Sequence, residues 1–140
     1  MIDMSINKIF TLLTGLSVAG ASMVPLHSQS HRTNDTDQKV REAIETYVSA
    51  GDQRDAARLD SILHQHFRVV ANQLMGSSTV NVITKEQYIG LVKDGKLGGD
   101  SRSVEIITLE FVNKNASARV RLKGKALSFD TFYQFIQSPE

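Results

Sequence analysis

The chain has 140 residues, a formal net charge of +1 and 41% apolar residues, a composition typical of one soluble globular domain with a single core. A net charge this close to zero gives no global reason to expect binding to nucleic acid or to a membrane surface. The lack of cysteine excludes disulfides, thiolate zinc sites, cysteine nucleophiles and a lipid-anchoring cysteine.

The N-terminus has the layout of a secretory signal peptide. Lys8 precedes an uncharged run from Ile9 to Leu26, and Ala19-Gly20-Ala21 supplies the small residues of a cleavage site. The strongly apolar centre of the run is shorter than the roughly 20 residues needed to span a bilayer, which favours cleavage over an uncleaved anchor. We therefore expect export to the periplasm or the medium, with no stable membrane insertion after cleavage. The predicted organisation is a signal peptide at 1–21, a flexible lead-in at 22–36 and a single domain at 37–140.

Three helices and a short hairpin are predicted next. Apolar residues recur at helical spacing in three segments, and the two segments between them are rich in β-branched residues. Thr84 and Gln87 have the spacing of a capping box, which marks the start of the third helix. The predicted bounds are a first helix from Thr36 or Asp37 to Gly51, a second from Ala56 to His64, strands at 67–74 and 79–83, and a third helix from Thr84 to Gly95.

The last part of the chain predicts a three-stranded antiparallel meander. Apolar and polar residues alternate strictly from Ala116 to Lys123, so this strand has one buried and one exposed face. The alternation slips near Ile106-Ile107 in the preceding strand, which indicates a bulge. In the following strand, Phe129, Tyr133 and Phe135 share one face, and Asp130 lies on the other.

This order of elements predicts an α+β fold. Three N-terminal helices would cover one face of an antiparallel sheet, which must curl around them to bury both surfaces. A curled sheet closed by helices forms a cone, and its mouth is a natural site for a small molecule.

The segment from Tyr47 to Val70 resembles the helix-helix-strand opening of the nuclear-transport-factor-like superfamily. It is most similar to the SnoaL-like and "putative lumazine-binding" families, with Tyr47, Asp55 and Leu63-His64 at the matching places. The resemblance extends over about Val40 to Gln137. It implies the same cone-shaped fold and a homodimer formed through the outer face of the sheet.

Members of these families follow the strand at 129–137 with another strand. This chain continues only with Ser138-Pro139-Glu140, so the last strand is expected to be missing. The edge of the sheet would then be left unpaired, which predicts lowered stability or pairing with another chain.

His64 and His66 are candidate metal ligands, because imidazole binds zinc. They lie at a helix-to-strand junction without a nearby carboxylate or third ligand in the sequence. The resemblance implies no metal. We therefore expect a helix-ending His64, a solvated His66, no metal and no cofactor.

A basic stripe follows one face of the middle strand of the meander. Glu105, Glu110 and Asp130 on the flanking strands are placed to neutralise it through cross-strand pairs. No aromatic residues interleave with the basic ones, so we expect no nucleic-acid binding. The stripe consists of Arg119, Arg121, Lys123 and Lys125.

Two functions stay open at this point. The first is an exported small-ligand-binding or scaffold protein that takes an apolar or aromatic ligand in the cone. The second is a small acid–base enzyme, such as an isomerase, cyclase or dehydratase, in which a pocket tyrosine such as Tyr47 and a carboxylate such as Asp130 transfer protons. The segment 67–74, where related isomerases place a base, contains no Asp or Glu, which favours the first function. The candidate pocket residues are Tyr47, Asn72, Tyr88, Phe129, Tyr133 and Phe135.

Overall fold

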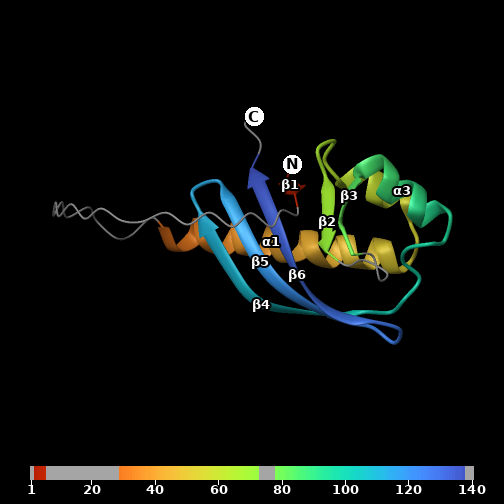
Figure 1. The fold of residues 1–140 in the computed structure, drawn as a ribbon. Coiled ribbons are helices and arrows are strands. Elements are labelled where there is room, and N and C mark those ends of the chain that lie inside the picture. The colour runs from red at the N-terminus through yellow and green to blue at the C-terminus, as the bar shows by residue number, and fades with distance from the viewer. Residues whose placement is uncertain (1, 6–28, 73–77, 138–140) are drawn as a thin grey trace.

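The computed structural model describes residues 2–5, 29–72 and 78–137, and these form the predicted α+β fold (Figure 1). Three helices and antiparallel strands follow one another in the expected order. The elements are β1 (Ile2–Ser5), α1 (Gln29–Asp52), α2 (Ala56–Ile62), β2 (Arg68–Asn72), β3 (Val80–Thr84), α3 (Lys85–Lys93), β4 (Ser103–Val112), β5 (Asn115–Lys123) and β6 (Ser128–Gln137).

The helices have the predicted ends at most positions. The Asp55 side chain accepts a hydrogen bond from the Arg58 amide at the start of α2, and Thr84 and Gln87 form the expected capping box on α3. The start of α1 differs, because the helix begins at Gln29 and not at Thr36 or Asp37. Residues 29–36 of the expected lead-in are therefore helical, and residues 22–28 lie outside the described residues.

The strands form two sheets, whereas the sequence predicted one curled sheet. The larger sheet has the order β1-β6-β5-β4, and β2 and β3 pair separately as a hairpin. All described pairs are antiparallel. The register of β4 on β5 shifts between Ile106 and Thr108, which confirms the predicted bulge.

The outer edge of β6 has a partner that the sequence did not predict. Residues Ile2–Ser5 pair with Gln134–Gln137, although the N-terminus was expected to serve only as part of a signal peptide. The expectation of an unpaired edge is therefore wrong for residues 134–137 of β6. The reason is that backbone groups of an edge strand accept any extended segment within reach, whatever its sequence.

The core lies between α1 and the concave face of the larger sheet. The buried stripe of α1 faces the inward residues of β5, which alternate with exposed ones as predicted. Figure 1 shows α1 running beside the curved strands β4, β5 and β6, with α3 and the β2–β3 hairpin at one end of the helix. The buried residues on the two sides are Val40, Ile44, Tyr47 and Val48 of α1 and Ala116, Ala118, Val120 and Leu122 of β5.

The outer face of the sheet carries the predicted cross-strand ion pairs. Arg119 and Arg121 both donate to the carboxylate of Asp130, and Lys123 pairs with Glu105. Hydrogen bonds from Arg121 and then Arg119 lower the pKa of Asp130 from its ordinary 3.8 to about 2. Among the described residues, the two carboxylates Asp130 and Glu105 thus pair with three of the four cations of the basic stripe, and the predicted pairing of Glu110 is not seen.

Replacing Asp130 tests this network through the pH dependence of stability. The folded-state pKa lies below the unfolded-state pKa, so the carboxylate stabilises the fold above pH 3.8 and loses this effect as the pH falls through about 2. Asp130→Asn should lower the free energy of unfolding at neutral pH, and the difference from wild type should shrink in that acidic window. Urea unfolding at a series of pH values measures this difference in the free energy of unfolding. Glu110→Gln, on the same face of the sheet, is the control. A difference that is constant across pH would refute the network.

Replacing Gly124 by alanine tests the packing of the β5–β6 turn, and the same replacement at Gly90 in α3 is a matched control. A Cβ at Gly124 would lie 2.0 Å from Oδ2 of Asp100. This carboxylate accepts a hydrogen bond from the Lys125 amide at Oδ1 and one from the Ala126 amide at Oδ2. A Cβ at Gly90, inside α3, would have no atom within 4 Å beyond its chain neighbours and the backbone of its own helix. Gly124→Ala should destabilise the protein by about 1–3 kcal/mol, whereas Gly90→Ala should stabilise it by about 0.4–1 kcal/mol. Thermal unfolding distinguishes them, and equal effects would contradict the assigned packing.

Candidate functional site

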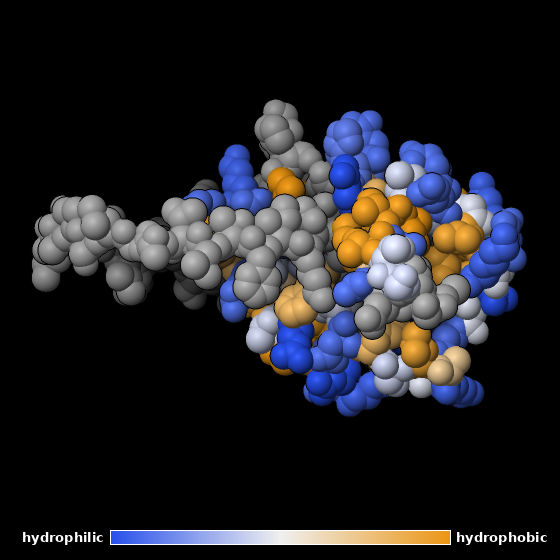
Figure 2. Space-filling view, in the orientation of Figure 1, coloured by the Kyte–Doolittle hydropathy of each residue, from blue (hydrophilic) through white to orange (hydrophobic). Residues whose placement is uncertain are grey.

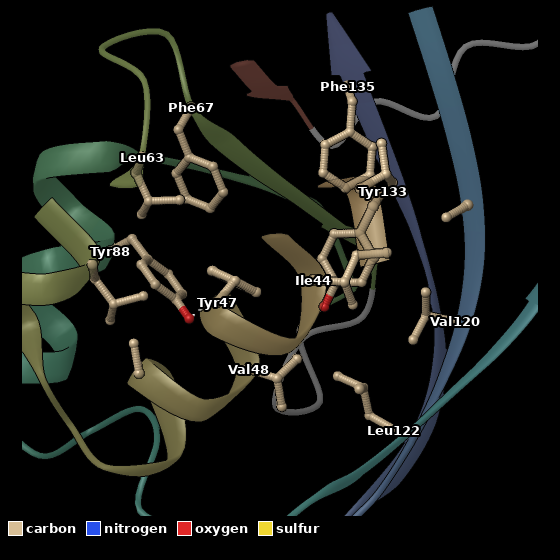
Figure 3. Close-up of a cluster of buried hydrophobic side chains, with 14 of the residues drawn as sticks. Ile44, Tyr47, Val48, Leu63, Phe67, Tyr88, Val120, Leu122, Tyr133 and Phe135 are labelled. Carbon is tan, nitrogen blue, oxygen red and sulfur yellow. Dashed lines mark hydrogen bonds between the residues drawn. The ribbon is translucent and has the colours of Figure 1, made fainter. Parts of the chain in front are cut away.

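Four aromatic rings from four parts of the chain meet between the helices and the sheet. The ring of Tyr47 lies with its centroid 6.0 Å from Phe67, 5.9 Å from Tyr88 and 5.8 Å from Tyr133. Figure 3 shows Phe67, Tyr88 and Tyr133 pointing into the space between the helices and β6. We call these four residues the tyrosine cluster.

The local structure places each ring in the cluster. Tyr47 lies on the buried stripe of α1, and Tyr88 lies in the first turn of α3 behind its capping box. Tyr133 is on the inward face of β6, where its strand partner is Ala118. Because the side chain of Ala118 is small and fully buried, the space above it is available for the Tyr133 ring.

The three hydroxyls of the cluster are not equally satisfied. Tyr47 Oη donates to Tyr88 Oη at 2.9 Å. The hydroxyl of Tyr133 has no hydrogen-bond partner among the described residues, although this side chain is only 2% exposed. Burial raises the pKa of all three hydroxyls, so at neutral pH each keeps its proton. The cluster therefore offers hydrogen-bond donors in an apolar surrounding.

A partly buried ion pair lies beside the cluster. Asp52 at the end of α1 accepts from the backbone N–H of Arg102 at 2.9 Å and from Arg102 Nε at 2.5 Å. The two side chains are only 16% and 13% exposed. A Cβ at Gly51 would lie 3.3 Å from Arg102 Nη2 and 3.7 Å from Tyr88 Oη, so the guanidinium group and the cluster meet at Gly51.

The structure brings four of the six predicted pocket residues into the core. Tyr47, Tyr88 and Tyr133 belong to the cluster, and the Phe135 ring lies 6.4 Å from Tyr133. Phe129 shares the inward face of β6 but is 38% exposed near the β5–β6 turn. Asn72 is exposed at the end of β2 and lies outside the core. Their roles as ligand contacts stay predictions.

Three residues of this site were not predicted from the sequence, namely Phe67, Asp52 and Arg102. Phe67 precedes β2 and had no distinguishing pattern. Asp52 and Arg102 are far apart in sequence, and nothing in either segment indicates that the two pair. The glycine at position 51, directly before Asp52, was the one local signal of a close approach.

A surface hollow lies elsewhere, between β3 and α3. It has a volume of about 420 Å³ and is open to solvent. Figure 2 shows apolar surface gathered over the β2–β3 hairpin, where Val80 and Val82 are exposed. None of the six predicted pocket residues lines the hollow, which is formed by Asn81, Val82, Ile83, Gln87, Gly90, Leu91 and Asp94.

The two histidines lie close together just beyond α2, which ends at Ile62 with Leu63 as its C-cap and not at His64 as predicted. Their ring centroids are 5.2 Å apart, and His64 Nδ1 accepts from the His66 amide. Within residues 2–5, 29–72 and 78–137, no group of three His, Asp or Glu side chains is close enough together to hold a metal ion. Asp130 lies on the outer face of the sheet, away from the cluster, so it does not reach Tyr47.

Comparison with known proteins identifies relatives of the chain. The family model described as "Putative lumazine-binding" matches residues 35–139, which is more than half of the chain. The structure is similar to the crystal structure of an NTF-2-like protein of unknown function from Silicibacter pomeroyi. That similarity has a TM-score of 0.65 and 18% sequence identity, and covers 76% of this chain and 87% of that one. No curated protein matches the sequence.

The two kinds of hydroxyl in the cluster predict opposite mutational effects. In ligand-free protein, Tyr47→Phe should cost about 1–3 kcal/mol, because it removes the donor of a buried hydrogen bond. Tyr133→Phe should be neutral or stabilising, because the lost hydroxyl has no partner in the part of the chain that the structure describes. Urea unfolding measures both changes in stability, on protein that has been refolded from denaturant so that it is free of ligand. A large loss for Tyr133→Phe would show that its hydroxyl is already paired within the protein.

Proposed function

Because the chain belongs to the "Putative lumazine-binding" family and has the nuclear-transport-factor-like fold, we propose that it binds a small, largely apolar ligand beside the tyrosine cluster. The ligand would lie between the helices and the concave face of the sheet, in contact with aromatic rings. Tyr88 and Tyr133 would supply its polar contacts. Ligand binding, without catalysis, is the function that this site supports best.

The observation that carries this proposal is the buried Tyr133 hydroxyl, which has no hydrogen-bond partner among the described residues. A buried hydroxyl without a hydrogen-bond partner costs about 1–3 kcal/mol, and phenylalanine would fill the same space without that cost. Tyr88 also retains a donor, because its oxygen accepts from Tyr47 and its own proton remains available. A ligand oxygen that accepts from these hydroxyls would remove the cost.

Acid–base catalysis fits the same site less well. It requires a carboxylate or histidine within hydrogen-bond reach of Tyr47 or Tyr133. Tyr47 bonds to Tyr88, and the described residues provide no such group for Tyr133. The carboxylate of Asp52 lies nearby, but Arg102 binds both of its oxygens.

We further propose that the domain acts after export and as a homodimer. The exposed apolar residues on the outer face of the sheet support the dimer, since such groups are normally covered. They include Val112, Phe132 and Ile136. No described helix is long and apolar enough to cross a membrane. The predicted cleavage within residues 6–28 falls outside the described residues; it would remove β1 and leave residues 134–137 of β6 without this strand partner.

Native mass spectrometry of the purified protein tests ligand binding. We expect a co-purified small molecule that is released on denaturation, and a dimeric mass. Tyr133→Phe should retain much less of this molecule, whereas Ser117→Ala, which removes a hydroxyl from the outer face of β5, should retain it in full. A folded wild-type protein without any bound mass, and with Tyr133→Phe indistinguishable from it, would contradict the proposal.

A further inference from the structure

Gly90 lies in the interior of α3, where glycine is less favourable than alanine. Two conditions usually explain such a glycine, namely a positive φ or an atom so close that a Cβ would not fit. Among the described residues, the glycines with a positive φ are Gly95, Gly98 and Gly99. A Cβ at Gly90 would meet no atom within 4 Å beyond its chain neighbours and its own helix backbone. The missing side chain therefore leaves a space beside α3 that the fold does not fill.

That space belongs to the hollow between β3 and α3, since Gly90 is one of the residues that line it. The hollow has a volume of about 420 Å³, which is in the range of pockets that hold small molecules. Val82 of β3 and Leu91 of α3 form apolar walls, and Val82 is 56% exposed. Glycine at position 90 thus leaves apolar surface in contact with solvent, which a larger side chain there would cover.

The polar side chains at the hollow include two oxygen acceptors that the fold does not use. Asp94 is the one lining residue that carries a charge. Lys96 pairs with its Oδ2 at 3.3 Å, but both side chains are more than half exposed, so this pair contributes little. Oδ1 of Asp94 accepts no hydrogen bond from the described residues, and neither does Oδ1 of Asn81, whose nitrogen donates to a backbone carbonyl. These acceptors favour a ligand with a positively charged donor.

We propose that this hollow is a second binding site, for a small ligand with an apolar body and one protonated amine. The apolar body lies over Gly90, between Val82 and Leu91, and the ammonium group binds the free oxygen of Asp94. None of the lining residues belongs to the tyrosine cluster. The site is therefore separate from the one proposed above and does not depend on it.

Benzylamine and benzyl alcohol are probes of nearly the same size, and only benzylamine is charged at neutral pH. In an NMR titration of the full chain, both should shift the signals of Gly90, Leu91 and the Val82 methyl groups. Benzylamine should bind about two- to fivefold more tightly, the gain expected from one exposed ion pair. Equal affinities of the wild-type protein for the two probes would overturn the assignment of the amine to Asp94.

Asp94→Asn should make the affinities for the two probes equal, because it removes the one charge that lines the hollow. Asp35→Asn is the matched control. It removes the carboxylate of a similarly exposed ion pair, formed with Lys39 on α1. This variant should keep the preference for benzylamine, and a loss of preference in both variants would show that only the net charge of the protein matters.

Gly90→Leu tests whether the open space itself is the binding site. Leucine favours a helix more than glycine does, and a Cβ at this position meets no neighbouring atom. The variant should therefore be at least as stable as wild type in urea unfolding, so lost binding does not follow from unfolding. Its side chain takes up the apolar space that the probe needs, and both probes should bind about tenfold more weakly or not at all.

Three results would overturn the second site. The first is probe binding that a folded Gly90→Leu leaves unchanged. The second is a set of shifted signals around Tyr133 in place of Gly90, which would assign the probes to the tyrosine cluster. The third is self-association of the wild-type protein that Gly90→Leu abolishes, which would assign the hollow to contact with a second copy. Tyr133→Phe should leave binding at the hollow intact, so the outcome here is independent of the proposed function.

Discussion

The contacts of the Tyr47 ring join most layers of this fold. The ring lies on α1 and touches Phe67 ahead of β2, Tyr88 of α3 and Tyr133 of β6. Aromatic contacts of this kind add about 0.5–1.5 kcal/mol each beyond the burial of their surface. The β2–β3 hairpin is not paired with the larger sheet, so this cluster is a principal link between the two parts of the molecule. The same contacts that hold the fold together also define the candidate site.

Tyrosine at these positions is a poor choice for packing alone. Phenylalanine has nearly the same shape, and it would spare the core a hydroxyl that needs a partner. One hydrogen bond satisfies Tyr47, but the described residues leave Tyr133 and the proton of Tyr88 without an acceptor. The nearby Arg102 repeats this pattern, because it is fixed to Asp52 while the part of the chain that the structure describes offers its terminal nitrogens no acceptor. An arrangement of donors in an apolar space is what binding of an oxygen-bearing aromatic ligand requires.

Local patterns were enough to predict most of the fold. The alternation in β5, the bulge at Ile106 and the capping box at Thr84 are set by neighbouring residues, and each was confirmed. Pairing between distant segments was harder to predict. The β1–β6 pair depends on backbone groups, which carry no sequence signal, so the edge was wrongly expected to be free. The Asp52–Arg102 pair likewise depends on how the end of α1 meets the start of β4, which no local pattern encodes.

A crystal structure of the purified protein, at a resolution that shows ordered ligands and water, tests the central claim most directly. The feature to examine is the acceptor of the Tyr133 hydroxyl. The account predicts an oxygen atom of a bound small molecule within hydrogen-bond distance of Tyr133 Oη, with the Tyr47–Tyr88 hydrogen bond preserved. A protein side chain or carbonyl group as the acceptor would contradict it, because the hydroxyl would then be explained by the fold alone.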